Sequence, residues 1–361
     1  MTRQPVPQPG PLQVRVVEVV VETGDAHSLV LEPVDGAQGR FRYRPGQFLT
    51  VKVPTDRAGG AARCYSLCSS PLYEEKLKVT VKRTVDGYGS NWICDHVVEG
   101  DVLDVLRPAG TFVPDSLDQD FLLLAAGSGI TPVLSILKSV LYTGGGSVTL
   151  VYANRDEHSV IFREELAALA RQYGEQLTVV HWLESVQGRP TRTGLRSLAA
   201  GCTDRQVFVC GPGPFMDLAA EVLAGLGVPE RRVHVERFRS LTNDPFAEPA
   251  AEADAEAEAE ADAEPGEPVS TVEVEVDLDG VTTTVAWPRN RKLLDALLAA
   301  GLDAPFSCRE GNCSACACVL VAGEVELERN EVLDAADLAD GLVLACQALP
   351  RSERLKVSYD L

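Results

Sequence analysis

Five cysteines near the C-terminal end have the residue type and spacing to bind metal. Cys308, Cys313, Cys316 and Cys318 fall in the segment PFSCREGNCSACACVL, and Cys346 follows in VLACQALP. The first three are spaced C-x4-C-x2-C, so three thiol side chains stand on one short segment. Thiolate sulfur is a soft ligand that suits zinc and iron–sulfur centres. The pattern therefore predicts a metal site whose fourth ligand comes from elsewhere in the chain.

The spacing favours an iron–sulfur cluster over zinc. Cys346 follows Cys316 after 29 intervening residues, and the complete pattern is typical of plant-type [2Fe–2S] ferredoxins. Gly311 permits a tight turn that lets backbone N–H groups point at the sulfurs. A structural zinc site is the alternative, although such sites usually contain two short C-x2-C pairs and this segment has one. We expect a [2Fe–2S] cluster held by Cys308, Cys313, Cys316 and Cys346.

Cys318 is a separate question. It lies two residues beyond Cys316, so on an extended strand both side chains would share a face, and spacing alone leaves Cys318 open as a ligand. We expect it to be a small buried side chain instead.

A cluster carries one electron at a time and breaks no substrate bonds, so another centre must supply its electrons.

The segment ARCYSLCSSP contains residue types that suit a flavin. Arg63 offers a cation for a pyrophosphate, the Tyr65 ring can lie against a flat cofactor, and the Ser66 hydroxyl can hydrogen-bond to a flavin nitrogen. An ordinary turn at the end of a strand is the alternative. In DGYGSNWI, Gly87, Gly89 and Ser90 precede a helical segment, where backbone N–H groups can receive phosphate. There the alternative is a glycine turn with Ser90 as N-cap.

Two further segments suit a dinucleotide. In LLLAAGSGITPVLSIL a strand is followed by Gly127, Gly129, Thr131 and then Pro132, which we expect at the first position of a helix. The segment departs from G-x-G-x-x-G, the usual dinucleotide fingerprint, and a plain strand-to-helix turn is the alternative.

The second segment, VFVCGPGPFM, places Cys210, Gly211 and Pro212 at the end of another strand. In a parallel sheet this is the same rim as Gly127, where ligands bind. Cys210 is therefore expected to border a nicotinamide, with simple burial of its thiol as the alternative.

The elements that must position these residues change in character along the chain. The first hundred or so residues contain β-rich runs separated by Gly, Pro and Asp, which suggests an antiparallel barrel. After residue 118, apolar strands alternate with helical segments, which implies a doubly wound parallel sheet. Near the end, TVEVEVDLDGVTTTVAW is expected to form a hairpin that turns at Asp279-Gly280, before the helix KLLDALLAAG. The expected domains are residues 1–117, 118–243, a linker 244–268, and 269–361.

Composition limits the classes of function. The 361 residues carry a net charge of −20, which argues against nucleic-acid binding. Nine acidic and no basic residues lie between Glu248 and Glu267, so this low-complexity segment is expected to be a solvated linker, and about −11 remains for the rest. No stretch approaches the apolar length that a membrane span needs, and the N-terminus lacks a signal-peptide pattern. We therefore expect a cytoplasmic protein whose ten cysteines are not in disulfides.

Taken together, these motifs resemble the ferredoxin–NADP reductase superfamily with a C-terminal plant-type ferredoxin. The resemblance covers nearly the whole chain apart from the acidic segment. It implies an antiparallel FAD-binding barrel, an α/β NAD(P)-binding domain and an α+β β-grasp [2Fe–2S] domain. Segments such as RYRPGQFLTVKVP, RCYSLCSSP and GSGITPVLSILKSVL are especially similar to reductase components of 3-ketosteroid 9α-hydroxylase. Reductases of phenylacetyl-CoA epoxidase are the next group.

The resemblance also implies roles for residues. Arg63, Tyr65 and Ser66 would hold FAD, with Ser66 orienting its N5 atom for hydride transfer, and Lys82, Gly89 and Ser90 would line its pyrophosphate. Glu236 and Phe238 in VHVERF would close over the flavin. Arg155 would lie beside the adenosine ribose of the nicotinamide nucleotide. A cation at this position would favour NADPH, but the resemblance as a whole favours NADH.

The implied function is transfer of electrons from NADH, through FAD and the cluster, to a separate oxygenase, which for the steroid enzyme is a Rieske-type iron protein. A reductase of phenylacetyl-CoA epoxidase is the alternative. A self-contained diaphorase or oxidase and a zinc-binding interaction module are the more distant ones.

Overall fold

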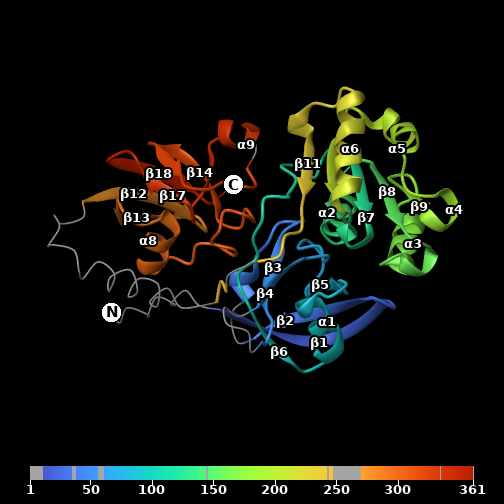
Figure 1. Ribbon diagram of the computed structural model, residues 1–361, viewed down its shortest axis with the longest axis horizontal. Helices are drawn as coiled ribbons and strands as arrows, with labels where there is room; N and C mark the ends of the chain where they lie inside the picture. The colour runs from blue at the N-terminus through green and yellow to red at the C-terminus, as the bar shows by residue number, and fades with distance from the viewer. Residues whose placement is uncertain are drawn as a thin grey trace. The chain divides into compact units, whose positions relative to one another are not determined.

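The computed structural model describes residues 11–34, 38–55, 61–143, 145–241, 244–246, 270–333 and 335–360. The chain divides into two compact units. The larger unit contains Leu12–Val53 and Arg63–Ser240, and the C-terminal unit lies within Leu241–Leu361. Figure 1 shows the elements of each unit. The predicted acidic linker 244–268 lies outside the described residues, apart from 244–246.

The N-terminal half of the larger unit is an antiparallel barrel. Its six strands are β1 (Leu12–Thr23), β2 (Ala26–Pro33), β3 (Phe48–Lys52), β4 (Ala62–Ser66), β5 (Leu77–Lys82) and β6 (Val102–Val105). The strand order is β4-β3-β6-β1-β2-β5, and a bridge between Leu67 and Val79 joins the two outer strands. Over its first five residues, β1 alternates buried and exposed side chains, with Leu12, Val14 and Val16 in the core. A 3-10 turn, η1 (Gln38–Phe41), and helix α1 (Tyr88–His96) complete this half.

The second half of this unit is a parallel sheet of five strands. They are β7 (Phe121–Ala126), β8 (Val148–Asn154), β9 (Leu177–Leu183), β10 (Gln206–Cys210) and β11 (Val233–Glu236). Their order, β11-β10-β7-β8-β9, reverses at β7, as in doubly wound folds. The connecting elements are η2 (Gly127–Gly129), α2 (Ile130–Thr143), η3 (Glu157–Ser159), α3 (Arg163–Gln172), α4 (Glu184–Gln187), α5 (Arg192–Ala199), η4 (Ala200–Cys202), α6 (Gly213–Gly225) and η5 (Glu230–Arg232). The apolar side chains of α2 pack on one face of the sheet and those of α5 and α6 on the other.

The C-terminal unit is a mixed sheet with one main helix. Its elements are β12 (Thr271–Leu278), β13 (Val281–Pro288), α8 (Leu293–Ala299), β14 (Ala317–Ala322), β15 (Val325–Leu327), α9 (Ala335–Ala339), β16 (Leu342–Leu344), β17 (Ala348–Pro350) and β18 (Arg354–Ser358). The order of the main sheet is β13-β12-β18-β14-β16, with β12 and β18 parallel. Trp287 is fully buried in the core and donates from Nε1 to the Arg291 carbonyl at 2.7 Å. The expected hairpin is present, and Asp279 and Gly280 turn it with φ of 54° and 75°.

Two local expectations were wrong. Pro132 is the third residue of α2 instead of the first, because the helix begins at Ile130 directly after η2. Proline is tolerated there because the N–H groups of a first helical turn have no acceptor within the helix. Gly89 and Ser90 lie inside the first turn of α1 instead of before it, and the N-cap is Gly87, so Ser90 does not cap the helix.

A buried ion-pair network joins the two halves of the larger unit. The Lys138 side chain on α2 is 1% exposed and pairs with Glu74 at 2.7 Å and with Glu165 of α3 at 3.0 Å. Lys78 of β5 pairs with the same Glu165 at 3.4 Å and with Glu22 of β1 at 3.3 Å. Burial alone would lower the pKa of Lys138, but Glu165 and Glu74 raise it above its ordinary value. We call these five residues the ion clamp, since they tie α2 and α3 to the barrel.

Serine hydroxyls extend this interface. Ser135 of α2 donates to the Ser69 carbonyl at 2.6 Å, and the Ser139 and Ser70 hydroxyls are 2.8 Å apart. All four serines lie between the barrel and the first helix of the parallel sheet. The two halves are therefore held by polar contacts as well as by apolar packing.

The ion clamp predicts a large effect of removing its central cation. In Lys138→Ala, the Glu74 and Glu165 carboxylates lose their nearest partner in a mostly buried site. Breaking a buried pair in this way costs about 3 kcal/mol or more of the free energy of unfolding. Chemical denaturation followed by release of flavin fluorescence would measure the loss. Lys76→Ala is the matched control, because Lys76 pairs with Glu32 on the surface, with side chains 50% and 47% exposed, and it should change stability little. Equal effects of the two variants would contradict the role of the clamp.

Candidate cofactor sites

A cavity of about 300 Å³ opens between the barrel and the parallel sheet of the larger unit. Its lining comes from β4, β5, the start of α1, the turn after β7 and the chain after β11. The lining residues are Arg63, Cys64, Tyr65, Ser66, Thr80, Lys82, Thr84, Gly87, Gly89, Ser90, Ser128, Thr131, Phe238, Arg239 and Ser240. The structure thus brings most of the predicted flavin residues to one cavity. Its volume lies at the lower end of the range for small-molecule sites.

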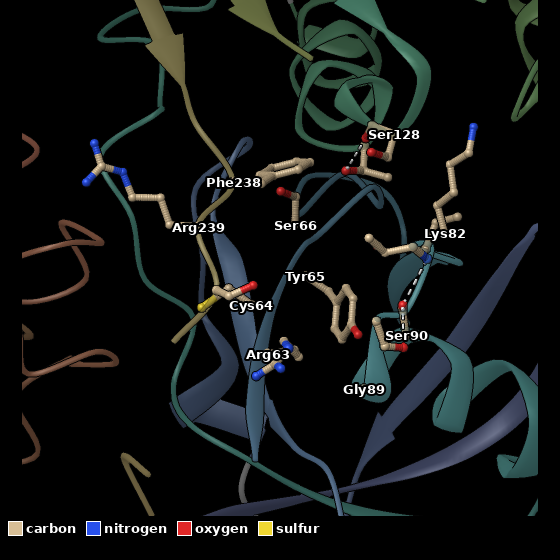
Figure 2. Close-up of a pocket in the computed structure, with 15 residues that line it drawn as sticks. Arg63, Cys64, Tyr65, Ser66, Lys82, Gly89, Ser90, Ser128, Phe238 and Arg239 are labelled. Atoms are coloured by element: carbon tan, nitrogen blue, oxygen red, sulfur yellow. Dashed lines mark hydrogen bonds between the residues drawn. The ribbon is translucent and has the colours of Figure 1, made fainter. Parts of the chain in front are cut away.

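Strand β4 supplies the centre of this cavity. Figure 2 shows Ser66 and Phe238 towards one end of the lining and Arg63 towards the other, with the Tyr65 ring between them. The Tyr65 hydroxyl is buried and has no hydrogen-bond partner among the described residues, and burial raises its pKa. A Cβ at Gly89 would lie 2.9 Å from Arg63 Cγ, so the start of α1 sits directly against this strand. An orphaned hydroxyl and a close-packed glycine fit a ligand with a phosphate and a planar ring, as FAD has.

The turn before α1 is built by its own side chains. The Thr84 N–H donates to Ser90 Oγ at 3.0 Å, and Ser90 Oγ donates to the Gly87 carbonyl at 3.4 Å. The Ser90 hydroxyl therefore shapes the turn, and its backbone N–H belongs to the first turn of a helix, where anions bind. Lys82 lies on the cavity lining, and burial lowers its pKa.

The carboxyl ends of the parallel strands form a second group of predicted residues. Gly129 packs so closely on β10 that a Cβ there would lie 2.1 Å from the Cys210 carbonyl oxygen, a position that only glycine can occupy. Gly127 adopts φ of 54° and lies near Lys82, whose Nζ would be 3.8 Å from an added Cβ. The Thr131 hydroxyl donates to the Ser128 carbonyl at 3.1 Å. The turn after β7 therefore lies beside the flavin cavity, as transfer between two cofactors requires.

Gly211 and Pro212 follow β10 at this rim, and Pro212 is the N-cap of α6. Asn154 is buried at the carboxyl end of β8, and neither Nδ2 nor Oδ1 completes a hydrogen bond with the described residues. The Tyr152 hydroxyl beside it donates to the Gly127 carbonyl at 3.0 Å. An unsatisfied buried amide at the rim where dinucleotides bind fits the predicted nicotinamide site.

Cys210 and Glu236 end neighbouring strands and are paired in register. Cys210 is fully buried and does not line the cavity, and burial together with Glu236 raises the pKa of its thiol. Burial also raises the pKa of Glu236 to about 7. Phe238, two residues further, is half-exposed and lines the cavity near Ser66.

Arg155 is separate from the flavin cavity lining. It follows β8, its side chain is 66% exposed, and its Nη2 lies 3.0 Å from Asp25 Oδ2 in the turn between β1 and β2. The same carboxylate lies 3.8 Å from Lys82 Nζ. Arg155 therefore bridges the parallel sheet to the barrel in this structure.

The C-terminal unit gathers the four predicted cluster cysteines. Cys308, Cys316 and Cys346 are buried, and Cys313 is half-buried. Cys308, Cys313 and Cys316 stand between α8 and β14, and Cys346 follows β16. Four cysteine thiols with this spacing are the ligand set of a plant-type [2Fe–2S] cluster.

Backbone amides surround these sulfurs. The N–H groups of Glu310 and Asn312 donate to Cys308 Sγ, both at 3.3 Å, and the Cys308 N–H donates to Cys313 Sγ at 3.3 Å. The Cys346 N–H donates to Cys316 Sγ at 3.4 Å. The two amides that donate to Cys308 Sγ stabilise a negative charge on this sulfur, and the thiolate is the form that binds iron.

Left-handed residues make this arrangement possible. Arg309, Gly311 and Ser314 have φ of 57°, 74° and 53°. A Cβ at Gly311 would also lie 2.9 Å from the Arg329 carbonyl oxygen, so glycine is required there. Cys318 is fully buried in the core on β14, and burial raises its pKa. The expectation of a small buried side chain therefore agrees with its position.

Several cavity residues were missed from sequence. Thr80 could have been found, because it lies two residues before Lys82 on β5 and so shares its face. Thr84, Arg239 and Ser240 stand in irregular segments, where no periodicity marks a facing side chain.

Three families of known proteins match the chain. They are described as an oxidoreductase FAD-binding domain over residues 13–113, an oxidoreductase NAD-binding domain over 123–221, and a 2Fe-2S iron-sulfur cluster binding domain over 276–351. The fold class and the three cofactor-binding domains expected from sequence are thereby confirmed. No helix among the described residues has both the length and the apolar character for crossing a membrane.

Whole-chain relatives are also found. The ferredoxin reductase component of 3-ketosteroid-9-alpha-monooxygenase from Mycobacterium tuberculosis is 56% identical over 97% of this chain and 96% of its own length. The protein of the same name from Rhodococcus rhodochrous is 53% identical over 95% of each chain. One of the subunits of 1,2-phenylacetyl-CoA epoxidase from Escherichia coli is 35% identical over 96% of each chain.

A solved structure has a similar fold. Phthalate dioxygenase reductase, described as a modular structure for electron transfer from pyridine nucleotides to [2Fe-2S], superimposes with a TM-score of 0.56 at 26% identity. The match covers 97% of this chain and 98% of that one.

The raised pKa of Glu236 predicts a pH dependence of stability. With a folded pKa near 7 against an ordinary 4.5, the folded state binds more protons than the unfolded state between these values. The free energy of unfolding should therefore fall as pH rises through this window. Glu236→Gln has no proton to lose, so its advantage over the wild type should grow as pH rises through the window and then level off. Thermal unfolding of the flavin-loaded protein would show this. Glu230→Gln, at an exposed position just before β11, is the control, and parallel pH curves for Glu236→Gln and wild type would refute the assignment.

Proposed function

This chain belongs to the family of ferredoxin reductase components of 3-ketosteroid-9-alpha-monooxygenase, and on that premise we propose that it transfers electrons from NADH to the oxygenase component of such an enzyme. The observation that carries the proposal is 56% identity extending over 97% of the chain, so that all three domains are shared. When bound, FAD accepts two electrons from the nicotinamide and releases them singly, and the cluster carries one at a time.

The residues of the flavin cavity hold and orient FAD. Arg63 would pair with its pyrophosphate, the buried Tyr65 hydroxyl would donate a hydrogen bond to FAD, and the Ser66 hydroxyl would orient the reacting edge of the ring. Lys82, Gly87, Gly89 and Ser90 line the phosphate side, where the N-terminus of α1 favours negative charge. Glu236 and Phe238 close over the ring and exclude water. The orphaned Tyr65 hydroxyl and the position of Phe238 on the lining support these assignments.

The rim of the parallel sheet binds the nicotinamide nucleotide. The proposed contacts are Gly127, Gly129, Thr131, Pro132, Arg155, Cys210, Gly211 and Pro212. Cys210 borders the nicotinamide ring from the end of β10, next to Glu236. NADH is preferred over NADPH, because a 2′-phosphate at Arg155 would compete with the Asp25 carboxylate that already pairs with it.

Cys308, Cys313, Cys316 and Cys346 hold the [2Fe–2S] cluster, with Cys313 as the most accessible of the four. We assign residues 1–117 to the FAD domain, 118–243 to the NAD domain, 244–268 to a linker and 269–361 to the ferredoxin domain. We further propose that the protein is cytoplasmic, a compartment in which thiols of the kind that would hold the cluster stay reduced.

Reconstitution with purified oxygenases would test the partner. With the Rieske-type oxygenase component of a 3-ketosteroid 9α-hydroxylase, NADH and a 3-ketosteroid, hydroxylated steroid should form with NADH consumption matched to product. The oxygenase of phenylacetyl-CoA epoxidase should give product far more slowly. If the epoxidase is the better partner, the family's steroid role does not extend to this chain. Rapid oxygen consumption that neither oxygenase increases would indicate a self-contained oxidase.

Cysteine variants would test the order of electron transfer. Cys313→Ala should remove the cluster and reduce NADH-dependent cytochrome c reduction by more than about tenfold, since no other one-electron carrier replaces it. Reduction of ferricyanide, which takes electrons directly from flavin, should be preserved. Cys318→Ala is the matched control and should keep its iron, acid-labile sulfide and both activities. Equal loss of both activities in Cys313→Ala would contradict the proposed order.

A further inference from the structure

The residue after the fourth cluster cysteine carries a side chain with no role so far. Gln347 lies between β16 and β17 and is only 4% exposed. Its Nε2 lies 2.9 Å from the Arg309 carbonyl oxygen and 3.5 Å from Cys346 Sγ. One amide group thus contacts both the loop that carries three cysteines and the fourth cysteine.

The chemistry of these neighbours fixes the orientation of the amide. A backbone carbonyl can only accept a hydrogen bond, and an iron-bound thiolate has no proton to donate. If the Gln347 amide were turned over, its oxygen would face two acceptors. The NH₂ group must therefore point to Arg309 O and Cys346 Sγ, and each of its two hydrogens has an acceptor.

The side chain is also held in place. The Gln347 N–H donates to the Leu344 carbonyl at 2.8 Å, and its own carbonyl accepts from the Glu328 N–H at 3.1 Å. A Cβ at Gly311 would lie 3.2 Å from Gln347 Cγ, so the stem packs under the cysteine loop. With the backbone fixed on both sides and the stem packed, the amide has little freedom to leave the sulfur.

A donor of this kind affects the two redox states unequally. A [2Fe–2S] cluster gains one negative charge on reduction, and part of that charge resides on its sulfur ligands. An N–H group that points at a ligand sulfur stabilises the more negative state more strongly. The surrounding backbone amides have the same effect, but only a substitution by proline, which also changes the backbone, would remove one of them. Gln347 supplies a donor from a side chain, which a substitution can remove.

We propose that Gln347 is a positioning residue that raises the reduction potential of the cluster, by donating a hydrogen bond from Nε2 to Cys346 Sγ while it anchors the Arg309 carbonyl. The inference rests on the proposed cluster site, and it adds one residue, Gln347, that influences the reduction potential of the cluster. A cluster without this donor is harder to reduce and accepts electrons from the flavin less readily.

Gln347→Met is the informative variant, because methionine keeps most of the volume under Gly311 and has no N–H donor. In the intact flavin- and iron-loaded protein, spectroelectrochemical titration should show less reduced cluster at a fixed ambient potential. We expect the ratio of reduced to oxidised cluster to fall about tenfold, which for a one-electron couple corresponds to about 59 mV. The FAD potential, measured in the same titration, should not change.

Asn330→Ala is the matched control. Asn330 is another amide of the C-terminal unit, and it follows Arg329, whose carbonyl abuts Gly311. Among the described residues, its side chain bonds backbone groups of Val332 and Leu333. Asn330→Ala therefore loosens the neighbouring loop without removing an N–H from sulfur, and it should leave the cluster potential at the wild-type value.

The outcomes separate the possibilities. A Gln347→Met protein with full iron content and an unchanged potential would overturn the inference, as would an equal shift in Asn330→Ala. If Gln347→Met does not assemble a cluster, the hydrogen bond is tested instead in the wild-type protein, labelled with side-chain ¹⁵N-glutamine. Pulsed EPR of its reduced cluster should then show a coupled glutamine nitrogen, and absence of that coupling would reject the donor. If the wild type contains no iron or acid-labile sulfide, the proposed function itself fails, and this inference with it.

Discussion

The buried ammonium of Lys138 is the contact on which the flavin and nicotinamide sites depend together. It lies on α2, the helix that begins directly after the turn Gly127–Gly129, and it is neutralised by Glu74 from the barrel side and Glu165 from α3. Lys78 continues the network on β5, the strand that also carries Lys82 into the flavin cavity. One strand and one helix thus each contribute to the clamp and to the site. Because a buried charge left without its partner is costly, these pairs constrain how α2 and α3 pack against the barrel.

The cluster site obtains its electrostatics in a different way. Its sulfurs are surrounded by backbone N–H groups, which the left-handed residues Arg309, Gly311 and Ser314 aim inwards. Two of these three are not glycine, and each such residue stores about 1–3 kcal/mol of backbone strain. That strain persists only because the sheet, Gln347 and the Arg329 backbone hold the loop on its other side. The donor geometry is therefore a property of the folded ferredoxin domain.

Sequence could predict the motifs because their chemistry is local. The spacing of the cluster cysteines, the Arg63–Ser66 segment and the strand runs all act within a few residues. In the structure Arg63, Tyr65 and Ser66 line one cavity. The ion clamp could not be predicted in this way. Lys138 is the one charged residue in the sequence of α2, and nothing nearby in the sequence shows that the Glu74 and Glu165 carboxylates will pair with it. The burial of Cys210 and the amide contact of Gln347 likewise depend on tertiary packing. The position of Pro132 was missed because η2 runs into α2 without a break, which no residue type marks.

The charged pairs around Lys138 and the backbone N–H groups around the cluster sulfurs suit the different tasks of the two units. Hydride transfer requires two ligands to meet at van der Waals distance, so the barrel and the parallel sheet must be held rigidly, and a network of full charges does this. Single-electron transfer tolerates a longer gap but depends on the energy of the reduced cluster, so the ferredoxin domain instead relies on many small dipoles near sulfur. Dipoles act over short range, since their field falls off faster than that of a charge. The hydrogen-bond donors that the structure shows on the cluster sulfurs lie between Cys308 and Gln347, so this part of the control over the potential belongs to the ferredoxin domain itself.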